Sequence, residues 1–157
     1  MKIVNCGNVE TKSRSPLETK KLGENLAKKI LKGKNCKRAK ILALKGDLGG
    51  GKTTFLQGFA KGLGIKDKIL SPTFVLMKKF EIPYNKKFKN FYHFDCYRIK
   101  NPKEILLIGF GEIISNPKNI IAVEWAERII KILPADKVLL EFSFLDKSNR
   151  KIWIKNV

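Results

Sequence analysis

Apolar residues along the chain alternate between helical spacing and short buried runs. From Ser15 to Gly33 they recur every four or five positions, and Ser15 and Pro16 are a typical helix start. Residues 40–45 form a short apolar run flanked by lysines, which is typical of a buried strand. Residues 53–63 return to helical spacing and are followed by Gly64. A glycine-dense turn therefore joins a predicted strand to a predicted helix.

The remaining pattern predicts more strands than helices. Strands are expected over residues 1–6, at an edge, and over residues 75–82, 88–94, 119–123, 137–145 and 151–157. Short helices are expected from Pro102 to near Gly109 and over residues 125–132, whereas Pro72 keeps residues 71–73 in a loop. Polar connections join four of the strands into two hairpins. The pattern thus predicts an α/β fold with a mixed central sheet flanked by helices.

Composition points to one globular domain, residues 1–157. The chain has 157 residues, of which 43% are apolar, enough for a single core. Its three cysteines form no CxxC pair, which argues against a disulfide framework or a zinc site. No stretch approaches the roughly eighteen apolar residues of a membrane span, and the first residues lack a secretory signal pattern. We expect a cytoplasmic protein with no contact with a membrane.

Net charge is the most unusual feature of the composition. The 33 Lys and Arg residues against 14 Asp and Glu residues give +19. Such a field attracts anionic partners, of which RNA and nucleotide are the obvious ones. The same excess fits a lysine-rich surface that only keeps the protein in solution, because the lysines are spread along the whole chain. Charge by itself leaves both interpretations open.

The glycine-dense turn carries the clearest chemistry. Residues 46–53, GDLGGGKT, fit the phosphate-loop pattern G-x-x-x-x-G-K-[ST] with no mismatch. Glycines let the backbone wrap around phosphate oxygens, and the next helix begins there with its positive end. Lys52 is expected to reach the β- and γ-phosphates, and the Thr53 hydroxyl to bind Mg²⁺. A chance glycine turn is the alternative, but its place between strand and helix favours a P-loop NTPase-like three-layer fold.

A second carboxylate is needed to hold Mg²⁺ or its waters. Asp95 and Glu124 each follow an apolar run that predicts a strand, and these patterns do not rank the two residues. Either acid could instead be a solvated strand end. No Asn-Lys-x-Asp segment for reading guanine is present, so adenine is the expected base.

Four segments together resemble one family. They are GDLGGGKTT at 46–54, SPTF at 71–74, HFDCYR at 93–98 and EWAER at 124–128. In this order they are similar to the TsaE family, also known as YjeE, which takes part in bacterial tRNA threonylcarbamoyladenosine synthesis. The resemblance runs from about Ser15 to Trp153. The phosphate loop alone is generic, whereas the other three segments are specific.

The resemblance implies roles for individual residues. Thr53 and Glu124 would be the Mg²⁺ ligands, and Asp95 would act in hydrolysis together with Lys52 and Glu124. Thr19 would lie near the adenine, Arg150 near the nucleotide, and Thr73 in a loop that senses the γ-phosphate. His93, Tyr97 and Trp125 are interpreted as strand or packing residues. The implied ATP site consists of Thr19, Gly46, Asp47, Leu48, Gly49, Gly50, Gly51, Lys52, Thr53, Thr54, Thr73 and Arg150.

The family also implies a function. The protein would be an ATPase, slow when isolated, that resets the complex of the TsaB and TsaD proteins and touches tRNA only indirectly or weakly. A small-molecule kinase with the same phosphate loop is the main alternative, although the few arginines do not form a lid-like cluster. A non-catalytic RNA-binding module is the third, suggested only by the charge.

Overall fold

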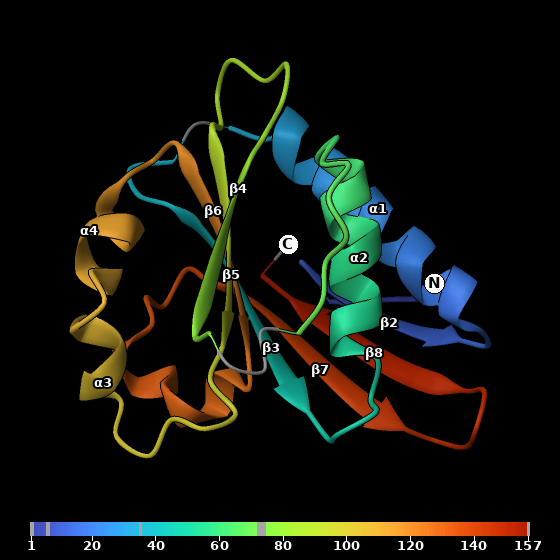
Figure 1. Ribbon diagram of the computed structural model, residues 1–157. Helices are drawn as coiled ribbons and strands as arrows, with labels where there is room; N and C mark the ends of the chain where they lie inside the picture. The colour runs from blue at the N-terminus through green and yellow to red at the C-terminus, as the bar shows by residue number, and fades with distance from the viewer. Residues whose placement is uncertain (1, 6, 35, 72–74, 157) are drawn as a thin grey trace.

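A mixed β-sheet runs through the centre of the molecule (Figure 1). The computed structural model describes residues 2–5, 7–34, 36–71 and 75–156. The described residues form eight strands in the order β1-β2-β8-β7-β3-β6-β5-β4. The strands are β1 (Lys2–Asn5), β2 (Asn8–Ser13), β3 (Lys40–Gly46), β4 (Met77–Glu81), β5 (Asn90–Asp95), β6 (Asn119–Glu124), β7 (Val138–Phe144) and β8 (Arg150–Lys155).

The four inner strands β7, β3, β6 and β5 are parallel, and the outer ones pair antiparallel. Both predicted hairpins, β4–β5 and β7–β8, are present, and β1 is an edge strand as expected. Because the inner strands are parallel, their carboxyl ends meet at one edge of the sheet, the place where α/β proteins bind ligands.

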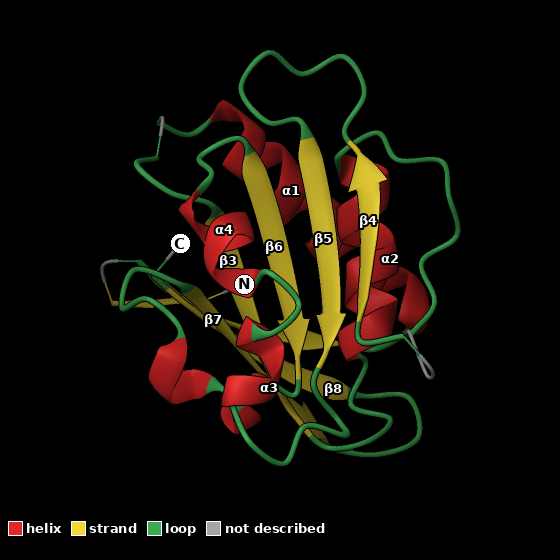
Figure 2. Cartoon of the chain, turned by 60° about the vertical axis from the view of Figure 1, so that its left-hand side comes forward, coloured by secondary structure: helices red, strands yellow, loops and turns green. Residues whose placement is uncertain are grey.

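Helices cover both faces, which confirms the three-layer prediction (Figures 1 and 2). The helices α1 (Pro16–Lys32) and α2 (Lys52–Gly62) lie on one face. The short helices α3 (Lys103–Leu106) and α4 (Phe110–Ser115) lie on the other, followed in sequence by the 3-10 turns η1 (Ala126–Arg128) and η2 (Ile130–Ile132). None of the helices in the described part of the chain is both long and apolar enough to span a bilayer.

The two long helices begin and pack for local reasons. Ser15 caps α1, its hydroxyl accepting from the Glu18 N–H at 3.1 Å, and Pro16 occupies the first turn. The two helices approach so closely that a Cβ atom on Gly58 would lie 1.9 Å from the Lys20 carbonyl oxygen. This packing fixes the N-terminus of α2, and with it the glycine loop, against the sheet.

Each face of the sheet buries its own core. Phe55, Phe59 and Phe91 belong to the core under α1 and α2, whereas Phe94 and Phe110 belong to the core under α3 and α4. Neighbouring residues on a strand point to opposite faces. This alternation, with the register between β5 and β6, decides which side chains reach the carboxyl edge on the α2 face.

Three local predictions were wrong. The pattern missed β2, because its buried positions are Val9, Thr11 and Ser13 and two of the three are polar. It also missed α4, since Gly109, expected near the end of a helix, precedes a new one. Residues 125–132 form two 3-10 turns and no α-helix, because the backbone leaves the helical region at Ile129, with φ −128° and ψ 14°.

Candidate nucleotide-binding site

The loop between β3 and α2 has the backbone that phosphate wrapping requires. Gly46 and Gly51 have φ values of 127° and 98°, which side-chain-bearing residues rarely adopt. At Gly46 a Cβ atom would also lie 2.2 Å from the Phe142 carbonyl oxygen. Gly51 is the N-cap of α2 and provides no side-chain cap, so backbone N–H groups at the helix start remain available to an anion.

Lys52 is buried within this loop. Its Nζ donates to the carbonyl oxygens of Gly46 at 2.5 Å and Asp47 at 2.7 Å. The same Nζ lies 4.2 Å from the centre of the Trp125 ring. Burial lowers the pKa of Lys52 below the ordinary lysine value, and the carboxylates of Glu124 and Glu127 oppose that shift. The ammonium therefore donates its hydrogen bonds to neutral carbonyl oxygens, which an anion, as a stronger acceptor, can replace.

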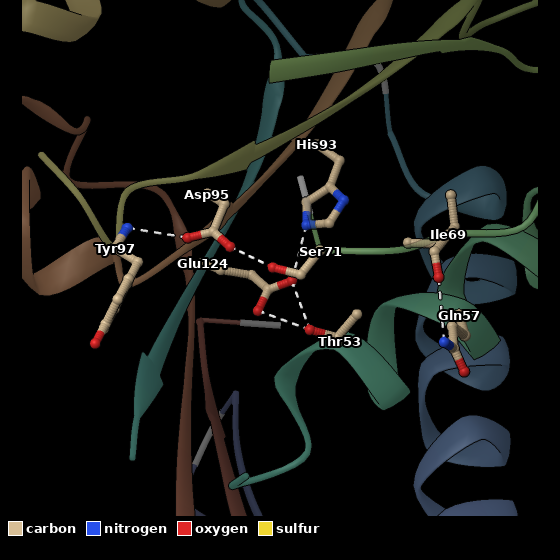
Figure 3. Close-up of polar contacts among 8 residues, drawn as sticks. All are labelled: Thr53, Gln57, Ile69, Ser71, His93, Asp95, Tyr97 and Glu124. Carbon is tan, nitrogen blue, oxygen red and sulfur yellow. Dashed lines mark hydrogen bonds and ion pairs between the residues drawn. The ribbon is translucent and has the colours of Figure 1, made fainter. Parts of the chain in front are cut away.

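Thr53 and Glu124 are brought together as the resemblance implied. The Thr53 hydroxyl is 3.0 Å from each carboxylate oxygen of Glu124 (Figure 3). Glu124 ends the wholly buried strand β6 and is itself 2% exposed. A buried carboxylate is costly unless it is hydrogen-bonded, and here a hydroxyl and a histidine satisfy it. These groups form the polar centre of the site.

His93 is a member of this centre that the sequence interpretation treated as a strand residue only. Its Nε2 lies 2.8 Å from Glu124 Oε1, and the ring is fully buried (Figure 3). Its Nδ1 has no hydrogen-bond partner among the described residues. The sequence did contain a sign that His93 belongs to the polar centre. His93 comes two residues before Asp95 on the same predicted strand, and residues i and i+2 of a strand share a face.

Asp95 lies directly beside Glu124, to which it is paired in the parallel register of β5 and β6. Its Oδ2 accepts from the Ser71 hydroxyl, and its Oδ1 accepts from the Tyr97 N–H at 2.9 Å (Figure 3). Asp95 is thus oriented by two donors at the edge of the site. Ser71 links it to the loop that carries Thr73, which lies outside the described residues.

Thr19 and Arg150 reach the glycine loop from two other elements. The Thr19 hydroxyl is already bonded, to Ser13 Oγ at 2.7 Å and to the Ser15 carbonyl at 3.2 Å. Arg150 Nε donates to the Gly49 carbonyl at 3.3 Å, and its guanidinium stacks 4.7 Å from the Phe144 ring. Both residues border the loop, with the Thr19 hydroxyl satisfied inside the protein.

A cavity of about 260 Å³ opens at the loop. Of the implied ATP residues, Gly46 and Asp47 do not line the cavity. Their carbonyl oxygens instead accept hydrogen bonds from Lys52. Trp125, expected to be a packing residue, lines the cavity and also packs on Tyr97 at 5.0 Å. Its lining residues are Ser15, Pro16, Thr19, Leu48, Gly49, Gly50, Gly51, Lys52, Thr53, Thr54, Ser71, Glu124, Trp125, Lys147, Ser148 and Arg150.

The donor set fits Mg²⁺ bound with a nucleotide. The described residues hold no cluster of three or more His, Cys, Asp or Glu that could cage a metal ion alone. Mg²⁺ does not need such a cage, because it keeps several waters and takes one or two protein ligands plus phosphate oxygens. Thr53 and Glu124 offer a hydroxyl and a carboxylate within 3.0 Å of one another, next to the loop.

A parallel-centred α/β sheet with this loop and a threonine bonded to a buried glutamate defines a P-loop protein. The family model "Threonylcarbamoyl adenosine biosynthesis protein TsaE" matches residues 13–152. The chain therefore belongs to the TsaE family, which takes part in tRNA threonylcarbamoyladenosine biosynthesis.

Similar proteins agree with this assignment. The chain is 40% identical over 135 residues to the TsaE protein of Rickettsia prowazekii, covering 85% of this chain and 88% of that protein. It is 34% identical over 126 residues to TsaE of Haemophilus influenzae, covering 80% and 76%. The crystal structure of Bacillus subtilis YdiB superimposes with a TM-score of 0.72 at 28% identity, covering 98% of this chain and 87% of that one.

Proposed function

We propose that this protein binds ATP and Mg²⁺ in the glycine loop and hydrolyses ATP in the cytoplasm. Hydrolysis would reset the complex of TsaB and TsaD, of which TsaD is the transferase that modifies adenosine 37 of tRNA. One observation carries the proposal: the Thr53–Glu124 pair stands beside Lys52 at the N-terminus of α2. A hydroxyl, a carboxylate and an ammonium at that place are what phosphate loops use for a triphosphate and its metal.

Lys52 and Thr53 would exchange partners when the nucleotide binds. A phosphate oxygen is a charged acceptor and a stronger partner for Lys52 than the carbonyls of Gly46 and Asp47. The Thr53 hydroxyl and a Glu124 oxygen would then face the metal position, with Glu124 kept in place by His93. Bound Mg²⁺ supplies charge neutralisation on the β- and γ-phosphate oxygens.

Asp95 is the residue we assign to the attacking water. Water attacks the γ-phosphorus while the bond from that phosphorus to ADP breaks, and a carboxylate beside the site orients the water. Asp95 suits this role because it adjoins Glu124 and is fixed by Ser71 and the Tyr97 N–H. Through Ser71 it is also linked to the loop of Thr73, our proposed sensor of the γ-phosphate.

The TsaB–TsaD complex would dock beside the nucleotide. A second cavity, of about 390 Å³, adjoins the first and shares Leu48, Ser71 and Trp125 with it. Large apolar residues at its rim, Leu48 and Val75, are exposed, with Leu48 at 79%. Exposed apolar groups beside a polar site are typical of a protein interface. We therefore expect slow hydrolysis by the isolated chain and faster hydrolysis in the complex.

The second cavity also supports one competing function. A small-molecule kinase needs an acceptor pocket next to the γ-phosphate, and this cavity contains Asp95 and Arg98. A screen of phosphoryl acceptors with labelled ATP separates the two. Release of inorganic phosphate with every acceptor supports the ATPase, whereas a stable phosphorylated product would support the kinase.

Single-turnover cleavage of ATP tests the main proposal. We expect cleavage to accelerate when TsaB and TsaD are added, and equal rates would contradict the proposal. Val75→Asp should lose most of the acceleration and keep its affinity for ATP, because Val75 borders only the second cavity. Leu17→Asp is the matched control, since Leu17 is exposed on α1 and lines neither cavity.

A further inference from the structure

The sheet edge opposite the nucleotide site gathers positive charge. Four segments lead into the parallel strands β3, β5, β6 and β7, and we call them the basic end. They are residues 32–40, whose last residue begins β3, and residues 82–89, 116–118 and 134–137. They contain one acidic residue, Asp136. Their basic residues are Lys32, Lys34, Lys37, Arg38, Lys40, Lys86, Lys87, Lys89, Lys118 and Lys137.

Contacts join three of the four segments of the basic end into one surface. Lys87 Nζ donates to the carbonyls of Gly33, at 2.8 Å, and of Lys34, which joins the β4–β5 loop to the end of α1. The Lys89 N–H donates to the Lys118 carbonyl at 2.8 Å. Figure 1 shows the β4–β5 loop and the end of α1 together at the top, far from the glycine loop.

Acidic side chains do not neutralise this surface. Among the residues that the structure describes, none of the ten basic side chains forms an ion pair. A cavity of about 150 Å³ there is bordered by Lys29, Lys34, Lys40 and Lys87 and, within the described ranges, by no carboxylate. Cations this close, without acids between them, produce a local positive potential that attracts a polyanion.

An exposed aromatic side chain stands within the same surface. Tyr84, in the β4–β5 loop, is 105% exposed, so its ring packs on no other described residue. Its backbone is left-handed, with φ 56°, which is unfavourable for a bulky residue and is retained here in a loop tip. Lys86 and Lys87 follow Tyr84 in the same loop. Exposed aromatic rings in basic segments are what proteins use to stack the unpaired bases of RNA.

We propose that the basic end binds RNA, with lysines on the phosphates and an unpaired base on Tyr84. A lipid surface is the less suitable partner, because membrane-binding faces carry several apolar anchors. Tyr84 is the single large exposed hydrophobic residue among the described residues of the basic end. This inference does not depend on the ATPase proposal, since the two sites lie at opposite edges of the sheet.

Charge reversal tests the lysine contacts. We compare the variant K34E/K86E/K118E with the matched control K100E/K103E/K131E, whose lysines lie toward the opposite edge of the sheet. Binding of a labelled, unmodified tRNA transcript is measured by fluorescence anisotropy at several salt concentrations. All six lysines are exposed. We expect the first variant to bind at least about tenfold more weakly and to lose roughly 2 to 3 from the slope of log affinity against log salt. Equal losses in both variants, or none in the first, would overturn the proposal.

Tyr84→Ala tests the stacking contact, with Tyr84→Phe as its control. The alanine variant should bind the tRNA at least about fivefold more weakly, and the phenylalanine variant about as well as the original. Unchanged binding by the alanine variant overturns the stacking role. Binding to phosphatidylserine vesicles as tight as to tRNA would overturn the choice of RNA. Calorimetry with ATP on the same variants tests the nucleotide site separately, and we expect no change.

Discussion

The two edges of the parallel strands differ in how their charges are held. At the carboxyl edge, Lys52, His93 and Glu124 are buried, and hydrogen bonds hold each of them. At the amino edge, Lys34 and Lys118 are exposed, and within the described part of the chain no acid pairs with them. Buried charges with fixed partners suit an exact arrangement around a triphosphate. Exposed charges suit a long, sequence-independent polyanion.

This difference has an energetic consequence. A substitution at the carboxyl edge removes a partner from a desolvated group and should cause large, specific losses of ATP binding or cleavage. A substitution at the amino edge removes one screened contact of several, so its effect should be modest and should depend on salt.

Asp95→Asn should lower the rate of ATP cleavage in the presence of TsaB and TsaD by at least about a hundredfold. The amide keeps the size of the carboxylate but is a poorer acceptor for the attacking water. The affinity for ATP should change by less than about threefold, because Asp95 does not line the nucleotide cavity. Rapid-quench measurement of the cleavage rate and calorimetry of binding distinguish the two quantities. A variant that cleaves ATP normally would exclude Asp95 from the reaction.

Lys52→Ala should weaken ATP binding by about a hundredfold, since a charge-assisted contact with phosphate is lost. Lys61→Ala, on the same helix and exposed, should bind ATP normally. Thermal unfolding should stay close to that of the original protein, because Lys52 donates only to neutral carbonyls. Tight binding by the Lys52 variant would contradict the assignment of the loop.

His93→Asn should raise the Mg²⁺ concentration needed for nucleotide binding by about tenfold, because Glu124 loses its fixed neighbour. His93→Gln should recover most of that loss, since its amide nitrogen can take the place of Nε2. ATP affinity without Mg²⁺ should not change in either variant. Equal Mg²⁺ requirements in both would assign His93 a packing role.

The tautomer of His93 offers a check without metal or substitution. The chain has one histidine, so a ¹⁵N-histidine spectrum contains one pair of ring signals. With Nε2 beside a carboxylate oxygen and Nδ1 lacking a partner among the described residues, we expect the proton on Nε2. A proton found on Nδ1 alone would contradict the hydrogen bond to Glu124.

Alkaline pH should produce the smallest effect. In the proposed function the ammonium form of Lys52 binds phosphate, and burial lowers the pKa of this group. Affinity for ATP should therefore begin to fall at a lower pH than for an exposed lysine, whose pKa is about 10.4. Calorimetry between about pH 7 and 10 measures the fall. A flat profile over that range would indicate that phosphate binding does not require the charge of Lys52.

The sequence by itself determined the glycine loop, α1 and α2, both hairpins and the mixed α/β fold, because these depend on neighbours within a few residues. Gly46 and Gly51, at fixed places in the phosphate-loop pattern, are enough to indicate an unusual backbone there, and both have positive φ. Sequence did not determine β2, since the buried face of that strand carries Thr11 and Ser13 in place of apolar residues. A period-2 pattern cannot be recognised when hydroxyls occupy its buried positions.

Only the tertiary structure decided how the distant polar residues meet. Thr53 and Glu124 are 71 positions apart, and the residue pattern alone could not rank Glu124 against Asp95. The parallel register of β5 and β6 sets these two acids side by side and brings His93 to Glu124. The same parallel order collected lysines from four separate segments at the opposite edge. The pairing of strands that do not form a hairpin depends on contacts between residues far apart in the chain, and no local pattern contains that information.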